Sequence, residues 1–287
     1  MSSWMAIGTC GGLALIGLYW KYVPSAAAPL ESLKEVTSRR IAAQDPVLWP
    51  EMAWEVSDYA SSPFGSTHYY LLGPDHGPRL VFVHGITAGS PCFPDLIQGL
   101  ADEGFRVLTF DLFGRGFSDS PGVPYGEALY TSQLHFLVSH LGWTSFHLVG
   151  LSLGGGIATS YATHFPLHIQ SLTLIAPAGL MPKLPPIAYA LQIPVVGPLI
   201  WYTLGRRILV SISESNYDPL RLSDRVRKTM LLTSYSVQHH PGFMRAYYST
   251  IQHFPVCGMD ATFTLLEQLH PGRVAVLWVC FWKYSSS

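Results

Sequence analysis

Residues 146–156 read FHLVGLSLGGG, and this stretch decides the fold. The run Phe-His-Leu-Val is typical of a buried strand, and the segment after it, GGGIATSYATHF, has a helical pattern. Between them, Gly150-Leu151-Ser152-Leu153-Gly154 matches G-x-S-x-G, the pattern of a serine on a sharp strand-to-helix turn. The pattern alone is weak in a chain with 26 glycines, but this context makes it specific. Ser152 is therefore a candidate nucleophile, and the alternative is an ordinary glycine-rich turn.

The glycines around Ser152 have a mechanical purpose in this interpretation. Residues without a Cβ leave room on either side of the serine for a strained turn. The hydroxyl then points into a cleft at a helix N-terminus, where backbone N–H groups and the helix dipole stabilise developing negative charge. Such a serine attacks an ester or amide carbonyl, and water hydrolyses the resulting acyl-enzyme.

Short β-rich runs alternate with helical segments along the chain, and this alternation predicts an α/β fold. Continuous apolar strands between helices are typical of a mostly parallel sheet with helices on both faces. The predicted strands cover 68–73, 79–85, 105–111, 145–150, 171–177 and 273–279. The predicted helices cover 92–103, 126–141 and 153–165.

The alternation breaks from Met181 to about His270. Within this insertion, residues 184–204 carry no charge, so a second membrane contact is one interpretation. Prolines at 185, 186, 194 and 198 instead favour a few short helices that cap a cleft. We interpret residues 181–269 as a lid.

The N-terminus has the pattern of a membrane anchor. No charged residue lies between Trp4 and Trp20, and the aromatic ends of this run are typical of a membrane interface. A secretory signal peptide cleaved near SAAA at 25–28 is the alternative, but no basic residue precedes the apolar run. Basic residues after the run favour a cytosolic catalytic domain. We therefore predict an anchor at 1–23, a connector at 24–66 and an α/β domain at 67–287.

Composition excludes several other classes of function. The net charge is only -1, which removes the electrostatic attraction that nucleic-acid binding requires. The four cysteines (Cys10, Cys92, Cys257 and Cys280) are scattered, so neither a disulfide framework nor a metal site is indicated. No nucleic-acid partner, metal or cofactor is predicted.

Together these features resemble the α/β-hydrolase fold family, in its serine esterase and monoacylglycerol-lipase-like type, over about residues 66–279. VFVHGITAGS at 81–90 is similar to the family's His-Gly loop, which implies an oxyanion hole made by the backbone N–H groups of Ile86 and Leu153. The same resemblance implies that His84 shapes this loop. FDLFGRGFSD at 110–119 is similar to the family's Asp-x-x-Gly-x-Gly-x-Ser segment, where Asp111 has a structural role.

The resemblance also implies the reaction. Epoxide and haloalkane hydrolases of this fold carry aspartate at the elbow, whereas Ser152 implies hydrolysis of carboxylic esters. An apolar lid and a membrane anchor indicate a hydrophobic, lipid-like ester, such as a monoacylglycerol or lysophospholipid. The predicted partners are this substrate and a membrane contacted through residues 4–20.

The rest of the catalytic triad is missing from the sequence pattern. In this family the acid and the histidine follow the serine in that order. HPGRVAVLW at 270–278 is similar to the approach to the acid, but Trp282 stands where the acid is expected and the given sequence stops at Ser287. The resemblance thus predicts a chain truncated before the acid, the histidine and the last strand and helix. We expect impaired activity as a result. The strand at 273–279 should then be an uncovered apolar edge of the sheet.

Other aspartates and histidines are candidates to replace the missing acid and base. They are Asp218, Asp224 and Asp260, and His239, His240, His253 and His270. None occupies a triad position of the family, so we interpret them as solvated or capping residues, and no catalytic acid or histidine is identified. A different hypothesis follows from the same gap: a non-catalytic binding or membrane-associated interaction protein that retains the fold.

Overall fold

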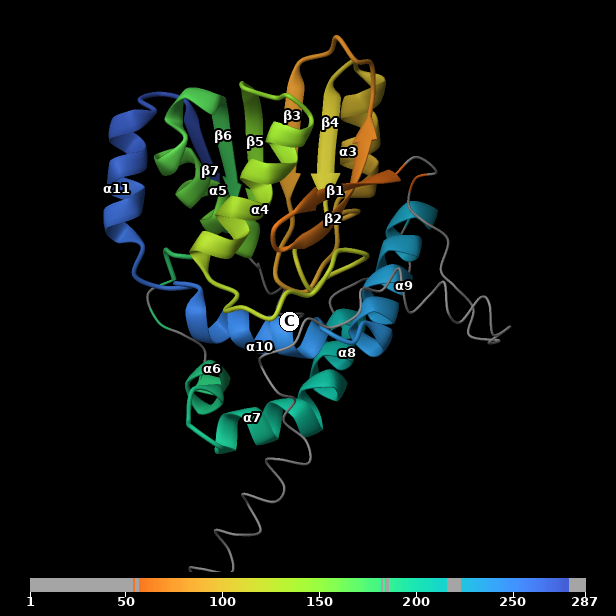
Figure 1. Cartoon of the computed structure of the whole chain (residues 1–287), viewed down its shortest axis with the longest axis vertical. Helices are drawn as coiled ribbons and strands as arrows, with labels where there is room; N and C mark the ends of the chain where they lie inside the picture. The colour runs from red at the N-terminus through yellow and green to blue at the C-terminus, as the bar shows by residue number, and fades with distance from the viewer. Residues whose placement is uncertain (1–53, 55–56, 182, 184–185, 216–222, 279–287) are drawn as a thin grey trace, which may run out of the picture.

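The computed structural model describes residues 54, 57–181, 183, 186–215 and 223–278. They form a seven-stranded sheet in the order β1-β2-β4-β3-β5-β6-β7 (Figure 1). β1 and β2 pair antiparallel, as do β2 and β4, and the remaining neighbours pair parallel. The strands are β1 Ser57–Ser62, β2 Gly65–Leu72, β3 Arg79–Val83, β4 Arg106–Phe110, β5 Phe146–Leu151, β6 Ile169–Ile175 and β7 Val274–Leu277. The predicted mostly parallel sheet is confirmed.

Both faces of the sheet are covered by helices, because its central strands are apolar on both sides. In β3, the four residues after Arg79 are all buried. One face packs against α4 (Glu127–His140) and α5 (Leu153–His164) in the main core, and the other packs against α3 (Pro94–Asp102). This arrangement places the N-terminus of α5 directly after the carboxyl end of β5, in the middle of the sheet.

The sheet begins earlier than the sequence indicated. Residues 57–62 fall in the predicted connector, yet they form β1 and pair along their whole length with β2. The stretch reads Ser-Asp-Tyr-Ala-Ser-Ser, which lacks the β-branched residues that mark a strand. Its pairing is set by the turn into β2 at Gly65, whose φ of 125° suits glycine.

Only part of the segment predicted as a lid covers the sheet, and its last helix packs on the α/β core. Its first part is a cap of helices at the carboxyl end of the sheet (Figure 1). These elements are α6 Pro186–Leu191, α7 Val196–Ile200, the π-helix η2 Trp201–Gly205, α8 Arg206–Ser215 and α9 Asp224–His239. The next helix, α10 (Phe243–His253), has residues in both cores: Phe243 packs in the cap core and Ala246 in the main core. The last, α11 (Asp260–Leu269), packs on α5 beside the sheet, so the cap ends well before residue 269.

Two parts of the sequence prediction fall on residues outside the described ranges. They are the N-terminal anchor with most of the connector, and the end of the chain from residue 279, including Trp282. Among the residues that are described, no helix has the length and apolarity to cross a bilayer. The described part of the uncharged segment 184–204 is divided among α6, α7 and η2, as its prolines predict.

β7 lies at one end of the described sheet and hydrogen-bonds to β6 on its inner side. Val276, Leu277 and the following Trp278 are all exposed. The apolar edge expected at 273–279 is therefore present in the described residues, and an exposed apolar strand edge favours association with other chains.

Candidate active site

Ser152 lies at the turn between β5 and α5 in a backbone conformation that is rare for residues with a side chain. Its φ is 52° and its ψ is -116°, and strain of this kind concentrates at functional sites. A Cβ added at Gly150 would lie 2.3 Å from Gly154 O, and one added at Gly154 would lie 2.1 Å from Val83 O. Only glycine fits at these two positions, so the flanking glycines have the mechanical role that the pattern predicts.

Backbone hydrogen bonds hold the Ser152 turn against the next strand. Ser152 N–H donates to Ile175 O at 2.9 Å, at the end of β6. Ser152 O accepts from Gly155 N at 2.9 Å and from Ala178 N at 2.8 Å. The serine is thus fixed between the carboxyl ends of β5 and β6, where parallel sheets place their ligands.

The predicted oxyanion-hole residues lie beside the serine. Ile86, Leu153 and Ser152 line the same cavity. The His-Gly loop passes close to the hydroxyl, because a Cβ added at Gly85 would lie 4.0 Å from Ser152 Oγ. Leu153 is the first residue of α5, and the N–H groups of a first helical turn have no intrahelical acceptor. This arrangement suits an oxyanion at the helix N-terminus, and the roles of Ile86 and Leu153 remain a prediction.

His84 is built into the loop and does not face the cavity as a base. Its Nε2 accepts from Leu112 N–H at 2.9 Å, so Nδ1 carries the proton and donates to Gly85 O at 2.7 Å. The side chain is fully buried, and this burial lowers the pKa of His84 to about 4 despite the nearby charge of Asp111. A neutral histidine with both nitrogens engaged shapes the loop, as the family resemblance implied.

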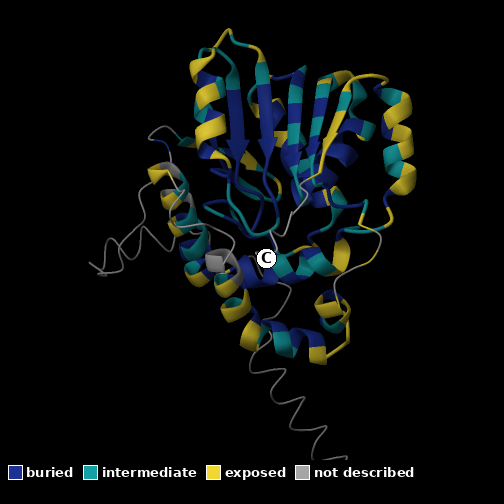
Figure 2. Ribbon diagram, turned by 180° about the vertical axis from the view of Figure 1, so that it is seen from behind, coloured by how far each residue is buried: buried dark blue, intermediate teal, exposed yellow. Residues whose placement is uncertain are grey.

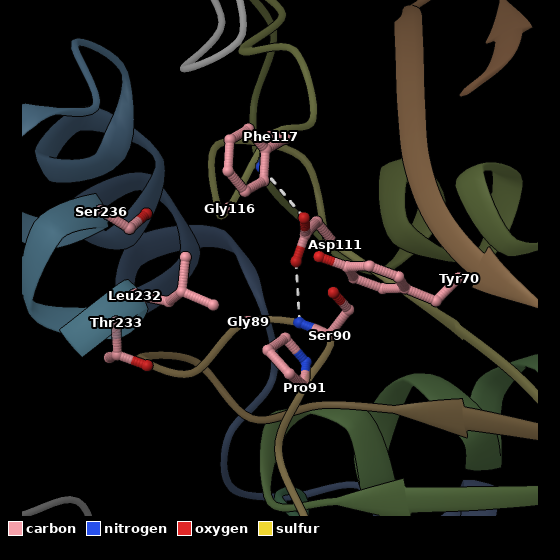
Figure 3. Close-up of a pocket in the computed structure, with 10 residues that line it drawn as sticks. All are labelled: Tyr70, Gly89, Ser90, Pro91, Asp111, Gly116, Phe117, Leu232, Thr233 and Ser236. Atoms are coloured by element: carbon pink, nitrogen blue, oxygen red, sulfur yellow. Dashed lines mark hydrogen bonds between the residues drawn. The ribbon is translucent and has the colours of Figure 1, made fainter. Parts of the chain in front are cut away.

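Asp111 is likewise a structural carboxylate. It accepts from Ser90 N at 2.7 Å and from Phe117 N at 3.0 Å (Figure 3). It also accepts from His68 Nδ1 at 2.8 Å. Burial would raise its pKa, but the hydrogen bond and charge of His68 lower the pKa of Asp111 to about 2. The small cavity beside it, shown in Figure 3, has a volume of about 20 Å³, room for one water molecule. It cannot hold a substrate.

A larger, apolar cavity opens beside Ser152, with a volume of about 270 Å³. The core contributes Ile86, Ser152, Leu153, Ala176, Ala178 and Val256, and the cap and α10 contribute Met181, Ile187, Ala188, Leu191, Ile200, Trp201, Gly205, Ile208, Leu209, Tyr247 and Ile251. The indole N–H of Trp201 is already engaged, because it donates to Met244 O at 2.7 Å. The cavity thus offers a hydroxyl at one end and an almost wholly hydrocarbon wall, which suits an apolar ligand.

The candidate substitute acids do not reach this cavity. Asp224 and Asp260 lie in the first turns of α9 and α11, at exposed positions. Asp218 lies outside the described ranges. Among the described residues, no carboxylate lines the cavity.

The candidate histidines are also engaged elsewhere. His240 is buried, accepts from Gly242 N–H at 3.0 Å and has Nε2 3.3 Å from Ser118 O. His270 Nε2 lies 3.1 Å from Ala162 O, and His253 Nδ1 lies 2.8 Å from Ser249 O. The ring of His239 packs on Tyr235. No imidazole of the described chain lines the cavity. His240 and His270 are capping residues at the ends of α9 and α11, as one part of the interpretation expected, but they are buried and not solvated.

Arg115 is a structural contact of the site that sequence reasoning missed. It is fully buried, its Nε donates to Ile86 O at 3.1 Å, and its Nη2 donates to Thr250 Oγ1 at 3.2 Å. Arg115 therefore ties the His-Gly loop to α10, which carries part of the cavity wall. The only sequence signal was an arginine between two glycines in an apolar stretch, and that pattern does not show which partners it binds.

Known proteins resemble the chain in both sequence and structure. A family model described as alpha/beta hydrolase fold matches residues 78–196. Monoacylglycerol lipase abhd6-B of Xenopus laevis is 35% identical over 111 residues, which are 38% of this chain and 33% of the relative. A serine hydrolase-like protein of Homo sapiens is 30% identical over 115 residues, which are 39% of this chain and 56% of the relative. The match therefore spans between about a third and just over half of these two relatives.

Solved structures show the same fold over more of the chain. The enol-lactonase from Burkholderia xenovorans has a TM-score of 0.60 at 17% identity, over 77% of this chain and 91% of that structure. A haloalkane dehalogenase variant from Bradyrhizobium elkanii has a TM-score of 0.63 at 16% identity, over 78% of each chain. At such low identity these similarities describe the architecture alone.

Proposed function

Because the chain belongs to the α/β-hydrolase fold family, we propose that it is a serine hydrolase of lipid-like carboxylic esters that acts through an acyl-enzyme on Ser152. One observation carries the proposal: the strained Ser152 opens onto an apolar cavity of about 270 Å³ between the core and the cap. The similarity to a monoacylglycerol lipase supports the same substrate class.

The proposed reaction has two halves. Ser152 Oγ attacks the ester carbonyl carbon, and the carbonyl oxygen takes up the negative charge and accepts from the N–H groups of Ile86 and Leu153. The alcohol leaves with a proton, and water then attacks the acyl-enzyme to release the acid and free the serine. Both halves require a group that takes and returns a proton.

The described residues supply no such group at the cavity, so we expect the activity of this chain to be low. Removal of triad members from serine hydrolases lowers the rate by roughly 10⁴ to 10⁶. The same observation favours the alternative function, an apolar-ligand binding or membrane-associated interaction protein that keeps the fold without turnover.

Hydrolysis of p-nitrophenyl esters by the purified full chain tests the proposed function. We expect a slow rate above the buffer background, with kcat/KM at least about tenfold higher for the octanoyl than for the acetyl ester, because the longer chain buries more apolar surface in the cavity. Ser152→Ala should remove this rate. Ser160→Ala is the matched control, since Ser160 is a buried serine of α5, the helix that follows Ser152, and does not line the cavity. Equal rates for the wild type and Ser152→Ala would contradict the proposal.

We further propose that residues 4–20 anchor the protein in a membrane, with the α/β domain on the cytosolic side. The uncharged run with tryptophans at both ends and the basic residues that follow it support this placement. The expressed full chain should stay in the membrane pellet after carbonate extraction, and its α/β domain should be digested by protease added to sealed microsomes. Release by carbonate, or protection from the protease, would contradict this topology.

A further inference from the structure

The outer surface of the cap is unusually apolar. Six large apolar side chains of α6, α7, η2 and the turns between them are exposed to solvent, and together they define what we call the cap face: Ile187, Tyr189, Ile193, Val195, Val196 and Leu204. The exposed parts of these helices appear in yellow at the bottom of Figure 2. Single exposed apolar residues are ordinary, but a group gathered on one short segment marks an interaction surface.

The cap face is continuous with the cavity beside Ser152. Ile187 and Ile208 both line that cavity, yet 52% and 39% of their side-chain surface is exposed. Both residues therefore belong to the cavity wall and keep part of their surface accessible to solvent, and Ile187 also belongs to the cap face.

The charges in the sequence segment that carries the cap face have one sign up to Ser213, and the next residue is Glu214. From Met181 to Ser213 the sequence contains no Asp or Glu, while Lys183, Arg206 and Arg207 are basic. Lys183 and Arg207 are exposed, and Arg206 is half-buried with its guanidinium donating to Gln238 O. Apolar side chains flanked by cations are typical of segments that lie in the interface of an anionic bilayer.

We propose that the cap face docks on the surface of a bilayer that contains anionic lipids, with Ile193 and Leu204 in the acyl boundary and Arg207 among the headgroups. A second copy of the chain is a less suitable occupant, because face-to-face pairing would bring like charges together. Docking is a property of the surface and does not depend on Ser152 being catalytic. The cap face is also separate from the anchor at 4–20, because it is formed by different residues.

Hydroxyl-radical footprinting of the full chain on vesicles tests this docking at the level of individual side chains. The chain is bound to phosphatidylcholine vesicles with and without phosphatidylserine, and the oxidation rate of each residue is divided by the intrinsic reactivity of its amino acid. Leu204 and Leu96 make a matched pair, since each is 49% exposed and Leu96 lies on α3 outside the cap. Leu167, 91% exposed before β6, is a second reference.

With anionic vesicles, we expect oxidation of Leu204 and Ile193 to fall at least about threefold below that of Leu96 and Leu167. Leu204→Glu should restore oxidation at Ile193, whereas Leu96→Glu should not. Arg207→Gln should raise the lipid concentration required for protection by about fivefold, since one cation near an anionic surface contributes about 1 kcal/mol. Circular dichroism of each variant checks that it is folded.

Equal oxidation of Leu204 and Leu96 on anionic vesicles would overturn the proposal, even if residues 4–20 hold the chain on the membrane. Protection that grows with the ratio of protein to lipid would also overturn it, because that result identifies a second copy as the occupant. Neither outcome depends on ester hydrolysis, so failure of docking and failure of the proposed reaction are separate results.

Discussion

Gly154→Ala is expected to lower the free energy of unfolding by about 4 kcal/mol or more. The added Cβ would lie 2.1 Å from Val83 O and 2.6 Å from His84 O. Both are backbone atoms of β3 and the loop that follows it, so no change of side-chain rotamer relieves the clash. The same contact sets the N-terminus of α5 against β3, and with it the position of Ser152.

Gly99→Ala is the matched control for this substitution. Gly99 lies within α3, and apart from its chain neighbours and the backbone of its own helix, no atom lies within 4 Å of the position its Cβ would take. Alanine at an open helical position is expected to stabilise the protein by roughly 0.5–1 kcal/mol. Urea unfolding followed by tryptophan fluorescence measures both changes. A Gly154→Ala protein as stable as the wild type would contradict the close packing at the elbow.

Stability should fall steeply as the pH is lowered from about 6.5 to about 4. Burial lowers the pKa of His84 to about 4, and burial likewise lowers the pKa of His240 to about 4. In the unfolded chain both histidines take up a proton near pH 6.5, so between these values the unfolded state binds more protons. Their contribution is therefore complete above about pH 6.5 and is lost as the pH falls, by up to about 1.4 kcal/mol per pH unit from each histidine.

His240→Asn tests whether His240 contributes to this pH dependence of the free energy of unfolding. Asparagine can accept from Gly242 N–H through Oδ1 in place of the imidazole Nδ1, but it does not titrate. The variant should show about half of the wild-type slope between pH 6.5 and 4.5, measured by urea unfolding at each pH. His76→Asn, at an exposed position, should leave the slope unchanged. An unfolding midpoint that is constant across this pH range would refute the prediction.

The sheet was predictable from the sequence because each central strand has a clear local pattern. β3, β4 and β5 are apolar runs bounded by turn residues, and the G-x-S-x-G turn links β5 to α5. β1 was missed because its residues have weak strand preference, and it is a strand only through its pairing with β2. The extent of the lid was overestimated for a similar reason: α11 is a helix by local pattern, and only its packing on α5 assigns it to the core.

The candidate site was predictable in part. Ser152 and its glycines form one local pattern, and their geometry follows directly from it. Arg115 was not predictable, because its role depends on bonds to Ile86 O and Thr250, which lie far from it in the sequence. The apolar cavity also required the structure, since its wall is shared between the core and the cap.

The most direct test of the account is the reaction of Ser152 with a fluorophosphonate probe, mapped by mass spectrometry on the purified, folded full chain. The probe reports attack by the serine alone and needs no later hydrolysis, so it reads the nucleophile even where turnover is slow. We predict modification at Ser152 that is abolished in Ser152→Ala and retained in Ser160→Ala. A folded protein that stays unmodified at Ser152 would contradict the account and would favour the non-catalytic alternative.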